Sequence, residues 1–77
     1  MLQEHQRVVL AENLPAERLE SGDVGTIVHV YRDGVAFEVE FLTLDGHTLT
    51  IVTVDSSQVR PVTSGDLTHA RLIEQST

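Results

Sequence analysis

The segment of residues 37–41 reads Phe-Glu-Val-Glu-Phe, with three apolar side chains on one face and the carboxylates of Glu38 and Glu40 on the other. This period of two is the pattern of a β-strand with one buried and one solvated face, and it does not suit an α-helix. Asp45-Gly46 follows, and Asp-Gly between two β-type runs is the strongest short-range signal for a hairpin. Because the next run, Thr48–Val54, is β-branched except at Leu49, the sequence predicts an antiparallel hairpin in a mainly β fold.

Three further runs have the composition of short strands: Arg7–Leu10, Asp23–Tyr31 and Val59–Val62. Residues 11–22 separate the first two runs and form a long loop with room for one helical turn. Residues 55–58 are polar and few, so we expect a tight turn there, with one turn of 3₁₀ helix.

Two residues constrain how these strands are arranged. Pro61 has no N–H to donate, so the last strand lies at an edge or a corner of the sheet. Gly25 inside a strand marks a bulge or the close approach of another backbone. Five short strands, a long first loop and a tight central hairpin are typical of a small SH3-like barrel. We therefore predict such a barrel over residues 1–62 and a C-terminal tail over residues 63–77.

The length of 77 residues predicts one domain, which buries only about 60% of the surface of its unfolded chain. Its stability should be roughly 4–11 kcal/mol. The interior is too small for a cofactor, so none is predicted, and the absence of cysteine excludes disulfides and thiolate metal sites. The alternation predicts a core of ten residues: Val8, Leu10, Val28, Val30, Phe37, Val39, Phe41, Leu49, Ile51 and Val59.

Charge restricts the class of partner. Twelve acidic residues stand against five arginines and no lysine, which gives a net charge of −7. Nucleic-acid binding draws its energy from a basic patch, so this charge disfavours nucleic acid and suits a basic protein. The first residues have no signal-peptide pattern, and no stretch approaches the ~20 apolar residues of a membrane span. We therefore expect a cytoplasmic protein that does not contact membranes.

Several segments of the chain resemble a known family. They are residues 22–31 (GDVGTIVHVY), residues 37–41 (FEVEF), Gly46 and residues 59–62 (VRPV). Together they are similar to a family of small bacterial proteins catalogued only as a domain of unknown function, and the resemblance covers Arg7–Val62. It implies an SH3-like barrel encoded beside genes for other uncharacterised proteins. It implies no activity, because the shared residues are turn glycines and core positions.

No arrangement of residues in the sequence predicts catalysis or metal binding. The four histidines fall in four different segments and lack the spacing of a metal motif. Glu38 and Glu40 lie roughly 7 Å apart along one strand face, a separation that glycosidase carboxylates also have. Two acids on a solvated strand face are, however, an ordinary means of solubility. We therefore predict no enzyme activity and no metal site.

The favoured hypothesis is a small binding or accessory module for a protein partner, which it would neutralise if a neighbouring gene encodes that partner. The candidate contact residues are Leu14, Leu19, Tyr31, Glu38 and Glu40. For the two leucines, the alternative is that they pin the long loop over the mouth of the barrel. Proline-rich ligands are disfavoured, because Tyr31 alone cannot line an aromatic groove.

Two other function classes remain open at this point. A homo-oligomer, such as a homodimer, would use residues 66–75 as a short helix with Asp66 as its cap. Its apolar face, formed by Leu67, Ala70 and Ile73, is too small to be stable alone. It would pack either on the barrel of its own chain or, as we favour, on a second copy near Val52 and Val54. A nucleic-acid-binding barrel is the third class, which the charge disfavours.

Overall fold

The computed structural model describes residues 2–73, which form one five-stranded antiparallel sheet in the order β4-β3-β2-β1-β5. The strands are β1 (Arg7–Leu10), β2 (Val24–Val30), β3 (Ala36–Leu42), β4 (Thr48–Asp55) and β5 (Val59–Pro61). Three 3₁₀ turns connect them: η1 (Pro15–Glu17), η2 (Arg32–Gly34) and η3 (Ser56–Gln58). The predicted mainly β fold, its five strands and its central hairpin are confirmed.

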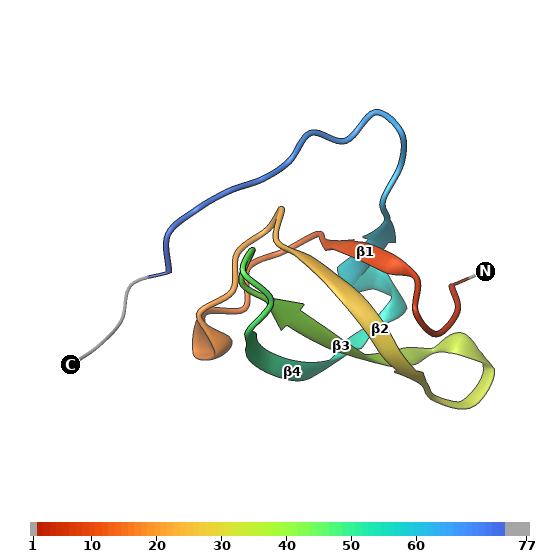
Figure 1. Ribbon diagram of the computed structural model, residues 1–77. Coiled ribbons are helices and arrows are strands. Elements are labelled where there is room, and N and C mark those ends of the chain that lie inside the picture. Colours follow the sequence, from red (N-terminus) through yellow and green to blue (C-terminus); the bar gives the residue numbers. More distant parts are fainter. Residues whose placement is uncertain (1, 74–77) are drawn as a thin grey trace.

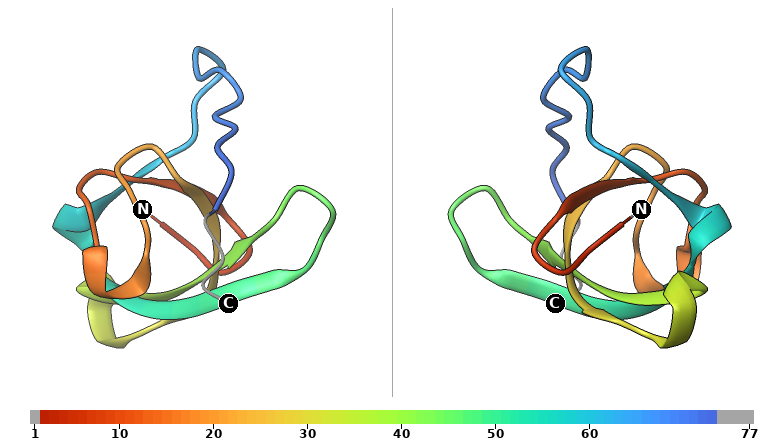
Figure 2. Two further views of the ribbon diagram at one scale, coloured as in Figure 1. Left: turned by 90° about the vertical axis from the view of Figure 1, so that its left-hand side faces the viewer. Right: turned by 90° about the vertical axis from the view of Figure 1, so that its right-hand side faces the viewer.

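The sheet curls around a single core, as both views of Figure 2 show. β1 pairs with β2 on one side and with the short β5 on the other. β4 pairs with β3 alone, so β4 and β5 form the two edges of a sheet that is not closed among the described residues. Pro61 ends β5 at one of these edges, as its missing N–H predicted.

Six of the ten predicted core residues are buried: Val8, Leu10, Phe37, Val39, Phe41 and Val59. The inward positions of β3 are those that the Phe-Glu-Val-Glu-Phe alternation indicated. The prediction was wrong for Val28, Leu49 and Ile51, which are 37%, 37% and 52% exposed, while Val30 is only partly buried. Ile27, Val52 and Val54 fill the core in their place.

The errors in β2 and in β4 have different physical causes. In β2 the register against β3 shifts between Ile27 and His29, so Val28 and Val30 do not share a face, and Val28 lies on the side opposite the buried Ile27. In β4 both faces carry apolar or β-branched residues, so the sequence alone did not distinguish them. Pairing with β3 decides, because opposite residues point to the same side of the sheet. Ile51 lies opposite the solvated Glu40, whereas Val52 lies opposite the buried Val39.

Gly25 lies where β2 crosses β3 most closely. A β-carbon at this position would be 2.5 Å from Val39 Cγ1 and 2.9 Å from the carbonyl oxygen of Glu40. The predicted close approach of another backbone is therefore confirmed.

The tail does not form the helix predicted from Asp66: residues 66–73 have no helical structure, and residues 74 and 75 lie outside the described part. The Asp66 carboxylate accepts hydrogen bonds from the Thr63 N–H and from the Arg60 guanidinium instead of capping a helix. The tail arches away from β5 and returns to the side of the long loop (Figure 1). Val52 and Val54 are buried by the chain's own core, so they offer no surface to the tail of a second copy.

Candidate functional site

The solvent-facing side of β2, β3 and β4 gathers three of the five predicted contact residues. We call this surface the outer face and define it by Tyr31, Glu38, Glu40, Ile51 and Thr53. Glu38 lies opposite Thr53, and Glu40 lies opposite Ile51, so the carboxylates alternate with neutral side chains across the hairpin. Both glutamates are half-buried, because the neighbouring strands flank them on each side.

Tyr31 is fixed at one end of the outer face. Its hydroxyl donates a hydrogen bond to Glu38 Oε2 at 3.0 Å, and its ring meets the His29 ring edge-on with centroids 4.5 Å apart. The hydrogen bond to the Glu38 carboxylate raises the pKa of Tyr31 above its ordinary value. At the other end, Glu40 accepts a hydrogen bond from the Thr48 hydroxyl. The two carboxylates are thus oriented, and each retains capacity to accept further donors.

Leu14 and Leu19 lie elsewhere, in the long loop. Their backbones form an isolated bridge, with N–H···O distances of 2.9 and 3.1 Å, that closes the loop around η1. Leu19 is 2% exposed within the core, and Leu14 packs against that core. The two leucines therefore pin the loop, and the buried Leu19 presents no side chain to a partner.

Asp23 is a functional candidate that sequence reasoning missed. Among residues 2–73, Asp23 is the one charged residue that is buried, with 8% of its surface exposed. The Arg71 guanidinium approaches it with two nitrogens, at 2.8 and 2.7 Å, and His69 Nε2 lies 3.3 Å away. Burial raises the pKa of Asp23, but the hydrogen bonds from Arg71 and from the Glu20 N–H outweigh this effect and hold the pKa below its usual value. In the sequence, Asp23 showed only the signature of a turn.

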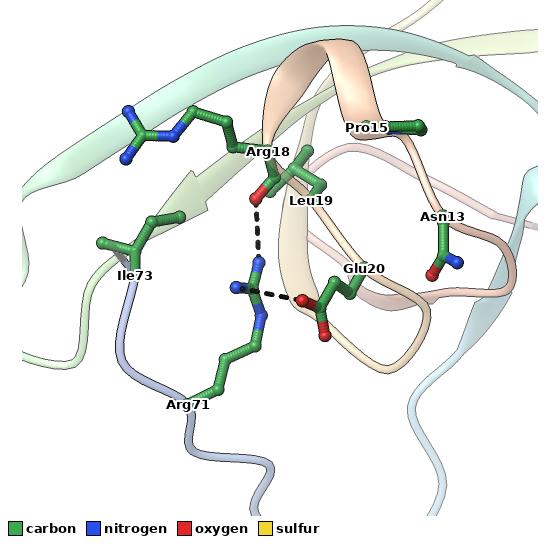
Figure 3. Close-up of a pocket in the computed structure, with 7 residues that line it drawn as sticks. All are labelled: Asn13, Pro15, Arg18, Leu19, Glu20, Arg71 and Ile73. Atoms are coloured by element: carbon green, nitrogen blue, oxygen red, sulfur yellow. Dashed lines mark hydrogen bonds and ion pairs between the residues drawn. The ribbon is translucent and has the colours of Figure 1, made fainter. Parts of the chain in front are cut away.

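Arg71 connects the tail to the long loop by further contacts. It donates to the Arg18 carbonyl at 2.9 Å and lies 3.6 Å from a Glu20 carboxylate oxygen (Figure 3). Arg71 and Ile73 line two cavities. The smaller, of about 470 Å³, opens towards the long loop, and the larger, of about 1010 Å³, extends to the tip of the β3–β4 hairpin. The larger one is a groove whose lining includes the apolar Phe41, Leu42 and Leu49 as well as the charged Arg7 and Glu40.

Two other histidines each lie near one carboxylate: His47 Nδ1 is 3.1 Å from Asp45 Oδ1, and His29 Nδ1 is 3.8 Å from Glu4 Oε2. His29 lies opposite Glu38, whereas His47 lies beyond the far end of β3, so these two histidines do not converge. Among residues 2–73, no group of three or more His, Cys, Asp or Glu side chains is placed to hold a metal ion. None of the helical turns in this range has the length or apolarity to cross a membrane.

Comparison with known proteins gives one match. The model of a family described as a domain of unknown function, DUF4926, matches residues 4–61. No curated protein and no solved structure matches the chain. The matched range contains all five strands, the outer face and Asp23, whereas Arg71 and His69 lie beyond it.

Proposed function

Because the chain belongs to the DUF4926 family of domains of unknown function, we propose that it is a non-catalytic, SH3-like barrel that binds a basic protein partner in the cytoplasm. The strand order, with a 3₁₀ turn before a short last strand, supports the barrel type. We propose that the partner is encoded by a neighbouring gene. The module would neutralise this partner by covering its basic surface.

The outer face carries this proposal. It combines two oriented carboxylates with apolar side chains that remain accessible, among them Tyr31 at 38% and Ile51 at 52% exposure. Exposed apolar groups next to charges are typical of interaction surfaces. The net charge of −7 attracts a basic partner from a distance, and the fixed carboxylates of Glu38 and Glu40 provide acceptors for arginine or lysine on contact.

The test is binding of the purified neighbour-encoded protein to matched charge variants. Glu38→Gln/Glu40→Gln removes two charges from the outer face, and Glu12→Gln/Glu17→Gln removes two from the long loop. We expect the first pair to weaken binding at least tenfold and to reduce its salt dependence, while the control pair changes both only slightly. Equal effects of the two pairs would show that overall charge matters and the outer face does not.

A homo-oligomer is the second candidate, and the free edge of β4 favours it. The Ser56 N–H bonds the Val35 carbonyl at 3.2 Å, and this bond fixes the alternation of the β3–β4 ladder. The backbone groups of Ile51 and Thr53 therefore point away from β3. No charge or proline interrupts Thr48–Val54, although such residues usually protect an edge strand.

An antiparallel pairing of two β4 edges about Ile51 would continue the sheet into a second copy and set His47 of each copy opposite Asp55 of the other. Ile51→Lys would place a charge at the centre of that contact, whereas Thr43→Lys, in the hairpin loop outside β4, serves as the control. Sedimentation equilibrium should show a dimer that only the Ile51 variant dissociates. A monomeric wild-type protein at ~100 μM excludes this candidate. Nucleic acid remains disfavoured, because Arg60 and Arg71 are engaged by Asp66 and Asp23.

A further inference from the structure

The carboxylate of Asp23 and the arginine that fills its site come from different parts of the chain. Asp23 lies inside the range matched by the family model, and Arg71 lies ten residues beyond the end of that range, at residue 61. The contact spans 48 residues of sequence. The receptor is therefore part of the family domain, whereas its present occupant is part of the tail.

The receptor is built without the tail. The Glu20 N–H donates to Asp23 Oδ2 at 2.8 Å, and the Asp23 N–H donates back to the Glu20 carbonyl at 3.0 Å. The Asp23 carbonyl accepts the Leu10 N–H at 2.8 Å, which ties this turn to β1. The Arg18 carbonyl, a further acceptor for the guanidinium, belongs to the same loop. These bonds orient two kinds of acceptor, a carboxylate and a carbonyl, towards one planar group with several N–H donors.

The occupant is held by few contacts. Within residues 2–73, no backbone hydrogen bond joins residues 67–73 to the rest of the chain. Leu67 and Leu72 are 90% and 94% exposed, so docking of the tail does not bury these two large apolar side chains. The tail thus docks as an extended segment, through the side chains of Arg71 and His69, with Ile73 against the cavities.

We propose that Asp23 and the Arg18 carbonyl form a receptor for an arginine on an extended segment of the basic partner, and that Arg71 occupies this receptor in cis until the partner displaces it. This inference rests on the proposed function and names a second contact of the same partner. Phe41, Leu42 and Leu49 form an apolar part of the groove beside the receptor, which suits an apolar residue next to the arginine. A short tether keeps Arg71 at a local concentration in the millimolar range, so the tail blocks weak ligands and yields to a partner that also binds elsewhere.

The test uses the full-length chain with Arg71→Ala, which vacates the receptor. The probe is an acetylated and amidated synthetic peptide of residues 66–73, Asp-Leu-Thr-His-Ala-Arg-Leu-Ile. We expect amide chemical shifts of Arg18, Glu20 and Asp23 to saturate with this peptide in the Arg71→Ala protein. The wild-type protein should bind it at least tenfold more weakly, because its own tail competes.

Three controls assign the binding to the receptor. A peptide with lysine in place of its arginine should bind at least fivefold more weakly, because it cannot make the two-nitrogen contact. Asp23→Asn/Arg71→Ala should lose the binding and keep its fold, since an asparagine oxygen still accepts the Glu20 N–H. Glu38→Gln in the Arg71→Ala background should bind as the parent does, because Glu38 belongs to the outer face and does not line the groove.

Equal affinity of the wild-type and Arg71→Ala proteins, or equal affinity for the arginine and lysine peptides, would overturn the proposal. The absence of saturable shifts in the Arg71→Ala protein would also overturn it. None of these outcomes depends on Tyr31 or Glu38, residues of the outer face that do not line the groove. The proposed function therefore stands or falls by its own experiment.

Discussion

Replacing Gly25 by alanine tests the packing between β2 and β3 directly. The added β-carbon would lie 2.5 Å from Val39 Cγ1, 2.9 Å from the carbonyl oxygen of Glu40 and 3.0 Å from Phe41 Cε1. A side chain can change its rotamer, but the Glu40 oxygen belongs to a strand that is paired on both sides. β2 must therefore separate from β3, which weakens the centre of the sheet.

Overpacking a core costs about 1–3 kcal/mol, and we expect the upper end here because backbone must move. In a domain of this size each kcal/mol lowers the melting temperature by about 4–8 °C, so the midpoint should fall by roughly 12–24 °C. Thermal unfolding followed by circular dichroism measures this shift. Gly65→Ala is the matched control, because its β-carbon would meet nothing closer than Thr63 Oγ1 at 3.8 Å. If both variants melt together, the close approach of β2 and β3 is wrong.

Three further predictions concern the core, the tail and the charge. Phe41→Ala should cost about 3–5 kcal/mol, since Phe41 is 3% exposed, and an unchanged urea midpoint would refute its core position. Docking of the tail should be lost in acid, because Arg71 lowers the pKa of Asp23 in the folded protein. His69 lies beside Asp23, and the Glu20 carboxylate lies beside Arg71. The contact is therefore complete above the ordinary Asp pKa of about 3.9 and disappears as the pH falls through the lower pKa of the folded state. Amide shifts of residues 69–73 that stay constant from neutral pH to full protonation of Asp23 would contradict this. Duplex and single-stranded nucleic acid should show no binding by fluorescence anisotropy at ~150 mM salt, and micromolar affinity with a steep salt dependence would overturn that expectation.

The parts of the fold that the sequence predicted correctly are those that local chemistry decides. Alternation over residues 37–41 determined the faces of β3, and Asp45-Gly46 marked the hairpin. Both signals lie within a few residues of the structure that they predict. For the same reason Tyr31, Glu38 and Glu40 were identified together: their positions follow from strand alternation and one turn.

The parts that the sequence could not predict depend on contacts between distant residues. The faces of β2 and β4 are set by register against β3, and the shift after Ile27 reverses the alternation within a single strand. Asp66 has the local pattern of a helix cap, yet Arg60, six residues away on β5, binds its carboxylate with two nitrogens. A marginal helix of about ten residues cannot compete with such a contact.

Two arginines pair with aspartates, which leaves the remaining charges of this chain more one-sided than its composition suggests. Arg60 and Arg71 each bind an aspartate within the fold, so each of these pairs is neutral as a whole. The net charge of −7 is then carried by ten acids against three arginines, a more one-sided ratio than the twelve to five of the sequence. A surface of this kind repels further acidic proteins and attracts basic ones at long range. Long-range attraction alone does not discriminate among basic proteins, so specificity must come from fixed acceptors at short range. The outer face holds two such acceptors, which are half-buried, and Asp23 is a buried one that Arg71 contacts with two nitrogens. Under the two proposals above, a partner that contacts both must present an arginine on an extended segment as well as a basic surface.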